Sequence, residues 1–238
     1  MVSIDTVYQK VLALANKEQR GYITPQEFNL FADHAQKEIF NQYFYDLDQR
    51  QRGVGNSLDY ANIQSGIEEK ISHFEIHDQS YAPSASGGEV VLSTDLYKIG
   101  TVRVDYTPST SIVDAEQIQL NQLKAISSPL TKPTILRPVY TITTGNIIKV
   151  YPHPIPTENV LVSYIKKPKK PNWTYVISNQ TALYNPGVSD HQNFELHYSE
   201  ENYLVVKILQ LAGVAIKDFN LSQAAAAKEA NTVQQEKQ

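Results

Sequence analysis

The chain has 238 residues, enough for one large domain or two modest ones, and 41% of them are hydrophobic, which is enough to form a core. It contains no cysteine, which excludes disulfides, thiolate metal sites and a cysteine nucleophile. The net charge of −4 favours no particular class of partner, and the first residues lack the basic and apolar regions of a signal peptide.

The acidic N-terminal section predicts helices. Residues 1–80 carry 12 acidic and 7 basic side chains, a net charge of −5. Apolar residues at helical spacing predict three helices, at Ser3–Lys17, Pro25–Leu47 and Leu58–His77. Thr24 is expected to cap the second helix, with Glu27 closing a capping box.

The middle section changes to the period of β-strands. Residues 79–88 read as a loop, and residues 81–190 carry a net charge of +3. Strands are predicted at Val90–Leu92, Ile99–Tyr106, Thr134–Thr143, Ile147–Tyr151 and Val160–Ile165. Thr144-Gly145-Asn146 predicts a hairpin turn, and Ala115–Ile126 a short helix.

The C-terminal section, residues 191–238, carries a net charge of −2 and returns to helix. Phe194–Phe219 is apolar almost all round, with a narrow polar strip at Lys207, Gln210 and Lys217 and an N-cap at Ser199. Such a helix must be enclosed by other elements or other chains. Its apolar run is shorter than the roughly 20 residues of a membrane span, so we expect no membrane partner.

The Ala-rich tail, Ser222–Gln238, favours helix but has no wide apolar stripe, so it must fray or be held by a neighbour. The order of elements predicts an α+β fold, with a helical framework and an inserted β-sandwich or barrel-like domain. The expected domains are 1–80, 81–190 and 191–238.

Metal and catalytic patterns are weak. Asn16–Glu27 has the outline of a calcium loop, but Arg20 stands where an oxygen ligand belongs, and a helix–turn–helix explains the same residues. His73 and His77, four apart on a predicted helix, lack a third metal ligand and are interpreted as exposed; His191 and His197 are no better supported. We expect no cofactor. No phosphate loop or serine elbow occurs, so we expect no enzyme, although carboxylates brought together by folding stay open.

One basic cluster contains Lys166, Lys167, Lys169 and Lys170, with Trp173 close behind it. Its charge suits nucleic-acid phosphates, which Trp173 could support. The alternative is a solvated loop stiffened by prolines.

Several segments together resemble the head-to-tail connector, or ring, proteins of short-tailed bacteriophages, including crAss-like phages. These segments are Val11–Phe40, Leu92–Val104, Pro138–Tyr140, Val150–Pro154, Ser163–Trp173, and the helix from Phe194 with its Ala-rich extension. The resemblance implies a virion protein, made in the host cytoplasm, that forms a ring of identical copies, commonly a dodecamer.

The resemblance also implies the partners. They are other copies of the chain, the portal protein, neighbouring ring or tail tube and fibre proteins, and double-stranded DNA passing non-specifically through the centre. On this reading the lysine cluster faces the DNA channel or a partner, and the tail contacts the portal or a neighbour through Ser222, Gln223, Lys228 and Glu229. A rival reading, motivated by the Tyr-rich β section, is a soluble binding or adhesion module for a glycan or protein ligand of a phage tail.

Overall fold

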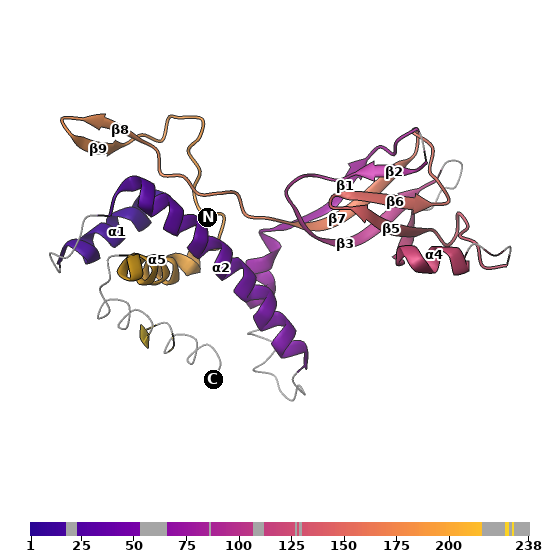
Figure 1. Cartoon of the computed structure of the whole chain (residues 1–238), viewed down its shortest axis with the longest axis horizontal. Helices are drawn as coiled ribbons and strands as arrows, with labels where there is room; N and C mark the ends of the chain where they lie inside the picture. Colours follow the sequence, from indigo (N-terminus) through magenta and orange to yellow (C-terminus); the bar gives the residue numbers. More distant parts are fainter. Residues whose placement is uncertain are drawn as a thin grey trace. The chain divides into compact units, whose positions relative to one another are not determined.

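The computed structural model describes residues 1–17, 23–52, 66–85, 87–106, 112–126, 128, 130–215, 227, 228 and 230. It is a mixed α/β structure with two compact units (Figure 1). We call Met1–His73 together with Pro168–Gln238 the helical unit, and Phe74–Lys167 the sheet unit. The sheet unit is therefore inserted into the chain of the helical unit.

The helical unit is built around α5 (Glu201–Ala215), which packs against both α1 (Ile4–Lys17) and α2 (Pro25–Arg52). Residues 66–72 are also helical. The enclosure that the apolar sequence of α5 requires is thus supplied within the chain by α1 and α2.

Helix α2 begins as its sequence predicts. The Thr24 hydroxyl accepts a hydrogen bond from the Glu27 N–H at 3.3 Å, and the Glu27 carboxylate accepts one from the Thr24 N–H at 2.9 Å. This capping box pairs two N–H groups that the helix cannot pair itself. The same hydrogen bonds lower the pKa of the Glu27 carboxyl.

The predicted start of the C-terminal helix is wrong. A short 3-10 turn, η1 (Tyr198–Glu200), precedes α5, and the His197 ring accepts the Ser199 N–H, so His197 rather than Ser199 is the cap. Lys207, expected on a polar strip, is buried and pairs with Glu38 of α2 at 2.8 Å. Lys217 lies outside the described residues.

The helix predicted over Leu58–His77 is wrong at its C-terminal end. Residues 53–65 lie outside the described residues, but β1 (Glu75–Tyr81) begins before that helix was expected to end. β1 pairs antiparallel with β7 (Asn159–Lys166). This pairing between distant segments outweighs the helical spacing of the local apolar residues.

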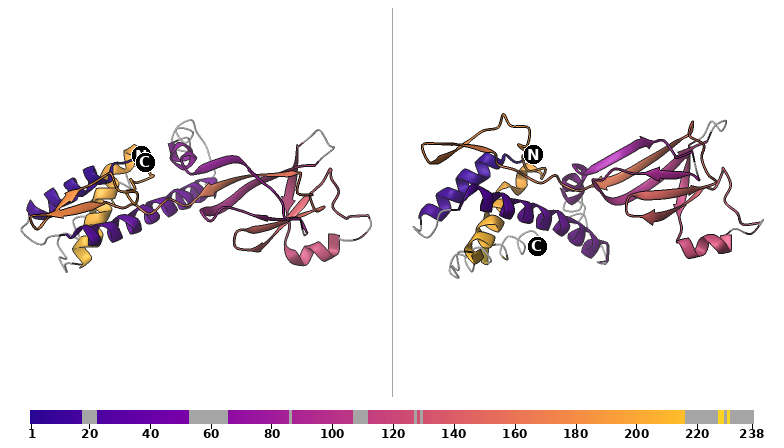
Figure 2. Two further views of the ribbon diagram at one scale, coloured as in Figure 1. Left: turned by 90° about the horizontal axis from the view of Figure 1, so that it is seen from above. Right: turned by 45° about the horizontal axis from the view of Figure 1, so that its top comes forward.

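The sheet unit is one curled sheet of seven strands, in the order β1-β7-β3-β4-β5-β6-β2 (Figures 1 and 2). The remaining strands are β2 (Glu89–Val91), β3 (Leu96–Asp105), β4 (Ile112–Gln117), β5 (Val139–Thr144) and β6 (Ile147–Tyr151). Neighbouring strands are antiparallel except β4 and β5, which are parallel. Alternate residues form one buried cluster that includes Val90, Val102, Val104, Tyr140, Ile148, Val150, Val160 and Val162.

The five predicted strands of this unit are confirmed, with shifted ends. β5 starts only at Val139, because Pro138 and the residues before it do not pair in the sheet as a strand. The predicted turn joins β5 to β6, and Gly145 takes a φ of 50° there. The helix expected at Ala115–Ile126 is partly wrong, since β4 occupies its start and α4 (Leu120–Ile126) only its end.

The limits of the β-rich section differ from those expected at 81 and 190. The sheet unit starts earlier because of β1, and it ends at Lys167 because residues 168–190 pack with the helices. This last stretch includes a hairpin that the sequence did not predict, formed by β8 (Tyr175–Ser178) and β9 (Thr181–Tyr184). The hairpin is a two-stranded sheet of its own, lying beside α1 (Figures 1 and 2).

Candidate assembly surface

Trp173 anchors the hairpin to the helices. Its side chain is only 2% exposed, and its Nε1 donates a hydrogen bond to Asp5 Oδ1 of α1 at 2.9 Å. The ring centroid lies 4.3 Å from that of Tyr8, and the indole stacks on Tyr175 and Tyr184 at 5.7 Å. Because the indole is buried, it cannot stack on a nucleic-acid base, which corrects the expectation that Trp173 supports DNA contact.

Two amide side chains of α2 hold the chain around Trp173. Asn29 Oδ1 accepts the Trp173 N–H at 2.8 Å, and Asn29 Nδ2 donates to the Trp173 carbonyl at 3.2 Å. Gln36, fully buried, donates to the Lys169 carbonyl at 2.7 Å and accepts the Glu195 N–H at 3.0 Å. Each amide therefore pairs with backbone as a neighbouring strand would.

Asn29 and Gln36 lie two helical turns apart on the face that also buries Phe28, Ala32 and Ala35. Two amides within an apolar stripe are a sequence signal, and it could have found these residues, because buried amides must find hydrogen-bond partners.

The hairpin carries exposed apolar side chains on the side away from its anchor. Tyr175 pairs with Tyr184 across the strands, and both rings face Trp173. The next pair, Val176 and Leu183, points to the opposite face and is 50% and 54% exposed. Ile177 is 71% exposed, and no residue from 174 to 189 is charged.

Burial also affects the base of the hairpin. It raises the pKa of Tyr184, whose hydroxyl lies 2.8 Å from His191 Nε2. The Asn185 N–H donates to the Thr174 carbonyl at 2.9 Å, continuing the pairing beyond the strands. The base of the hairpin is therefore fixed while its outer face is open to water.

A second exposed apolar surface lies on the sheet unit. It consists of Leu120, Leu130, Ile135 and Leu136, of which Leu130 is 97% exposed. The cations Lys124, Lys132 and Arg137 lie in the same stretch, and no acidic residue occurs from 117 to 157. The two apolar surfaces thus differ in charge.

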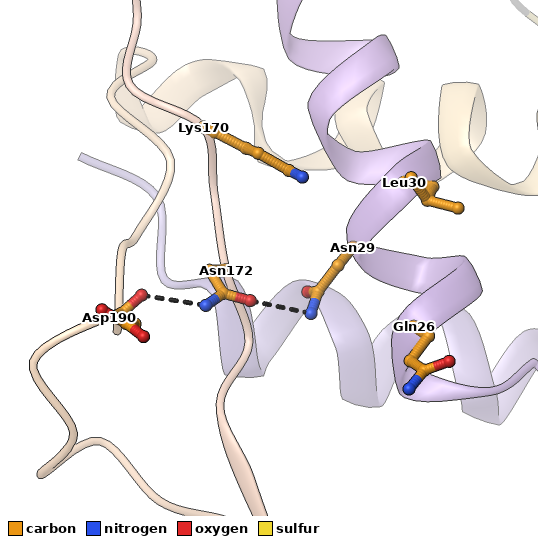
Figure 3. Close-up of a pocket in the computed structure, with 6 residues that line it drawn as sticks. All are labelled: Gln26, Asn29, Leu30, Lys170, Asn172 and Asp190. Atoms are coloured by element: carbon orange, nitrogen blue, oxygen red, sulfur yellow. Dashed lines mark hydrogen bonds between the residues drawn. The ribbon is translucent and has the colours of Figure 1, made fainter.

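A pocket of about 490 Å³ lies in the helical unit beside α2. Its lining residues are Gln26, Asn29, Leu30, Lys170, Asn172 and Asp190 (Figure 3). Asn29 donates to Asn172 Oδ1 at 2.9 Å, and Asn172 donates to the Asp190 carbonyl at 3.0 Å. Because these amides bond each other and the backbone, they build the wall of the pocket and are not free for a ligand.

The predicted lysine cluster spans the boundary between the units. Lys166 and Lys167 end the sheet unit, where their N–H groups donate to the carbonyls of Phe74 and Asp95 at 2.8 and 2.6 Å. Lys169 and Lys170 begin the helical unit with exposed side chains, and the Lys169 N–H donates to the Glu195 carboxylate at 2.8 Å. The backbone here is hydrogen-bonded, unlike that of a solvated loop.

The other predicted residues are not brought together. His77 lies in β1, so it does not share a helix with His73, whose ring packs 5.4 Å from that of His197. Of the tail, Lys228 is described and exposed, whereas Ser222, Gln223 and Glu229 lie outside the described residues. Within the expected calcium loop, residues 18–22 also lie outside them.

Among the described residues no three His, Asp or Glu side chains are grouped so that they could hold a metal ion. No helix in the described part of the chain combines the length and apolarity needed to cross a membrane. No protein-family model matches the chain, and no curated protein matches it.

Proposed function

We propose that the chain is a structural protein that assembles with copies of itself into a closed ring. The observation that carries this proposal is the β8–β9 hairpin, whose outer face exposes Val176, Ile177 and Leu183. A two-stranded sheet is marginally stable in water, and contiguous exposed apolar side chains mark interaction sites. Another subunit would cover this face.

Two unlike surfaces favour a ring over a twofold dimer. The hairpin face is uncharged, whereas the surface around Leu130 and Leu136 lies among cations. Head-to-tail contacts join different surfaces of adjacent copies, and they close into a ring when the rotation permits. In this proposal the helical unit is the framework of the ring and the sheet unit is its inserted, barrel-like domain.

The place of this ring comes from the resemblance to phage connector proteins. The proposed ring, commonly a dodecamer in those proteins, joins the portal protein to the tail of a virion and surrounds the DNA passage. Lys169 and Lys170, both exposed, would face DNA or a partner, and the tail from Ser222 would contact the portal. The ring needs no cofactor and catalyses no reaction.

Sedimentation and negative-stain images of the purified chain, alone and with its portal protein, test the proposal. The expected result is closed rings in at least one of these samples. A chain lacking residues 222–238 should keep its circular dichroism spectrum and lose portal binding. A monomer in both samples that binds glycans on an array would instead favour the adhesion module.

A further inference from the structure

We propose that adjacent copies join through main-chain pairing of their β8–β9 hairpins. The free edge of β9 in one copy pairs with the free edge of β8 in the next, so that the hairpins form one continuous sheet around the ring. This inference rests on the proposed ring and names the contact that closes it.

The seven-stranded sheet is protected against such pairing at both edges. At one edge, β1 has a register shift between Ile76 and Gln79, and Asp78 has a φ of 51° and pairs with Arg103. At the other edge, β2 has only three residues, and its Glu89 pairs with Lys149 at 3.5 Å. Bulges, charges and short strands are the features that prevent edge-to-edge association.

The hairpin has none of these protections. Its register is continuous from Tyr175–Tyr184 to Ser178–Thr181, without a bulge. Neither strand contains proline or a charged residue. Among the described strands, β8 and β9 pair only with each other, so each has one edge whose N–H and C=O groups face no strand. An uncharged, regular and apolar edge is a template for pairing with another chain.

Charge identifies the second copy as the occupant. A charged group buried against the hairpin would lose hydration without gaining an ion pair, so the partner surface must be uncharged. The apolar residues around Leu130 lie among cations, and Leu30 lies beside Lys170 and Asp190. Of these described apolar surfaces, the hairpin alone is uncharged and of matching strand length, so its complement is the hairpin of another copy.

The hairpin is also held ready for this contact. The Trp173 stack fixes Tyr175 and Tyr184 at its base, and Trp173 is itself bonded to Asp5 and Asn29. Little conformational freedom remains to be lost at the base when the edge pairs, and such preorganisation strengthens association.

A spin label measures the predicted contact directly. Because the chain contains no cysteine, Ser178→Cys at the end of β8 accepts one label. In a continuous sheet of hairpins the same site recurs every two strands, about 10 Å apart. We expect strong dipolar broadening of the continuous-wave spectrum of the assembled ring. The label at Asn121→Cys, on α4 of the sheet unit, should show none.

A charged variant provides the second test. Val176→Lys combined with Leu183→Lys places cations on the outer face and should weaken ring assembly at least tenfold in sedimentation. The control Ile155→Lys, at an exposed position of the sheet unit, should assemble normally. Emission from Trp173, the single tryptophan, verifies that the helical unit of each variant is folded.

The outcomes separate this inference from the proposed ring. Wild-type rings without broadening at position 178, or intact rings of the folded double variant, would overturn the hairpin contact and leave the ring standing. A wild-type chain that stays monomeric with its portal protein overturns both.

Discussion

At the residue scale, Trp173 tests how much one hydrogen bond across the helical unit contributes. Trp173→Phe keeps a ring in the stack but removes the donor to Asp5. We expect the free energy of unfolding to fall by about 1–3 kcal/mol, because hydrogen bonds to charged groups are worth this much. Urea unfolding followed by circular dichroism measures it. Asp5→Asn retains the Oδ1 acceptor and should cost less; an equal cost would contradict the assignment.

Gln36 tests the pairing of an amide with backbone. Gln36→Met has a similar volume but leaves the Lys169 carbonyl and the Glu195 N–H unpaired in a buried place, so stability should fall by about 1–3 kcal/mol. Gln26→Met, at an exposed position of the same helix, should change stability by less than about 0.5 kcal/mol. Equal effects of the two substitutions in thermal unfolding would show that Gln36 does not hold the segment.

Asp78 gives a pH dependence with a definite sign. The Arg103 guanidinium bonds the carboxylate and lowers the pKa of Asp78. A carboxyl with a lowered pKa in the folded state stabilises the fold above its unfolded-state value, about 3.9, and this contribution is lost as the pH falls through the folded-state pKa. The difference in melting temperature between wild type and Asp78→Asn should therefore shrink below about pH 4. A constant difference would exclude this ion pair as its cause.

The sequence predicted the residue-level contacts that are local and missed those that are not. The Thr24–Glu27 capping box spans three residues, and its pattern is readable in the chain. Trp173 and Asp5 are 168 residues apart, and no local pattern links them. For the same reason Trp173 was interpreted as part of a basic surface, when tertiary packing buries it.

At the element scale, the two hairpin turns form a matched pair. Gly145, at a φ of 50°, has no atom close to the place of a Cβ, so Gly145→Ala should cost about 1 kcal/mol of backbone strain alone. In the β8–β9 turn, Asn179 and Gln180 both take positive φ, where glycine is preferred. Gln180→Gly should stabilise that hairpin by a comparable amount.

Hydrogen exchange of the flanking amides measures both turns. Protection should fall in β5 and β6 for Gly145→Ala and rise in β8 and β9 for Gln180→Gly. Opposite signs would show that side-chain contacts, and not backbone conformation, control these turns.

Elements with a clear period were predicted, and elements that depend on distant pairing were not. α1, α2, β6 and β7 follow their apolar spacing. β1 exposes most of its side chains, so alternation is absent and only pairing with β7 makes it a strand. β8 and β9 are short, and their turn lacks the glycine that usually marks a hairpin.

At the scale of the whole molecule, the division into units followed contacts that the composition does not show. Loop-like residues near 80 suggested one boundary, but the insertion begins at Phe74 and ends at Lys167. The assembly surface was anticipated only as a general need for neighbours. Its location in the hairpin depends on Trp173, which turns Tyr175 and Tyr184 inward and leaves Val176 and Leu183 outside.

The mass of the purified chain in solution, measured by sedimentation with its portal protein present and absent, tests the central claim most directly. The account predicts a closed assembly of many copies in at least one of the two samples, and its loss when Val176 and Leu183 are both replaced by lysine. A stable monomer in both samples, across the concentrations at which the fold is intact, would contradict it.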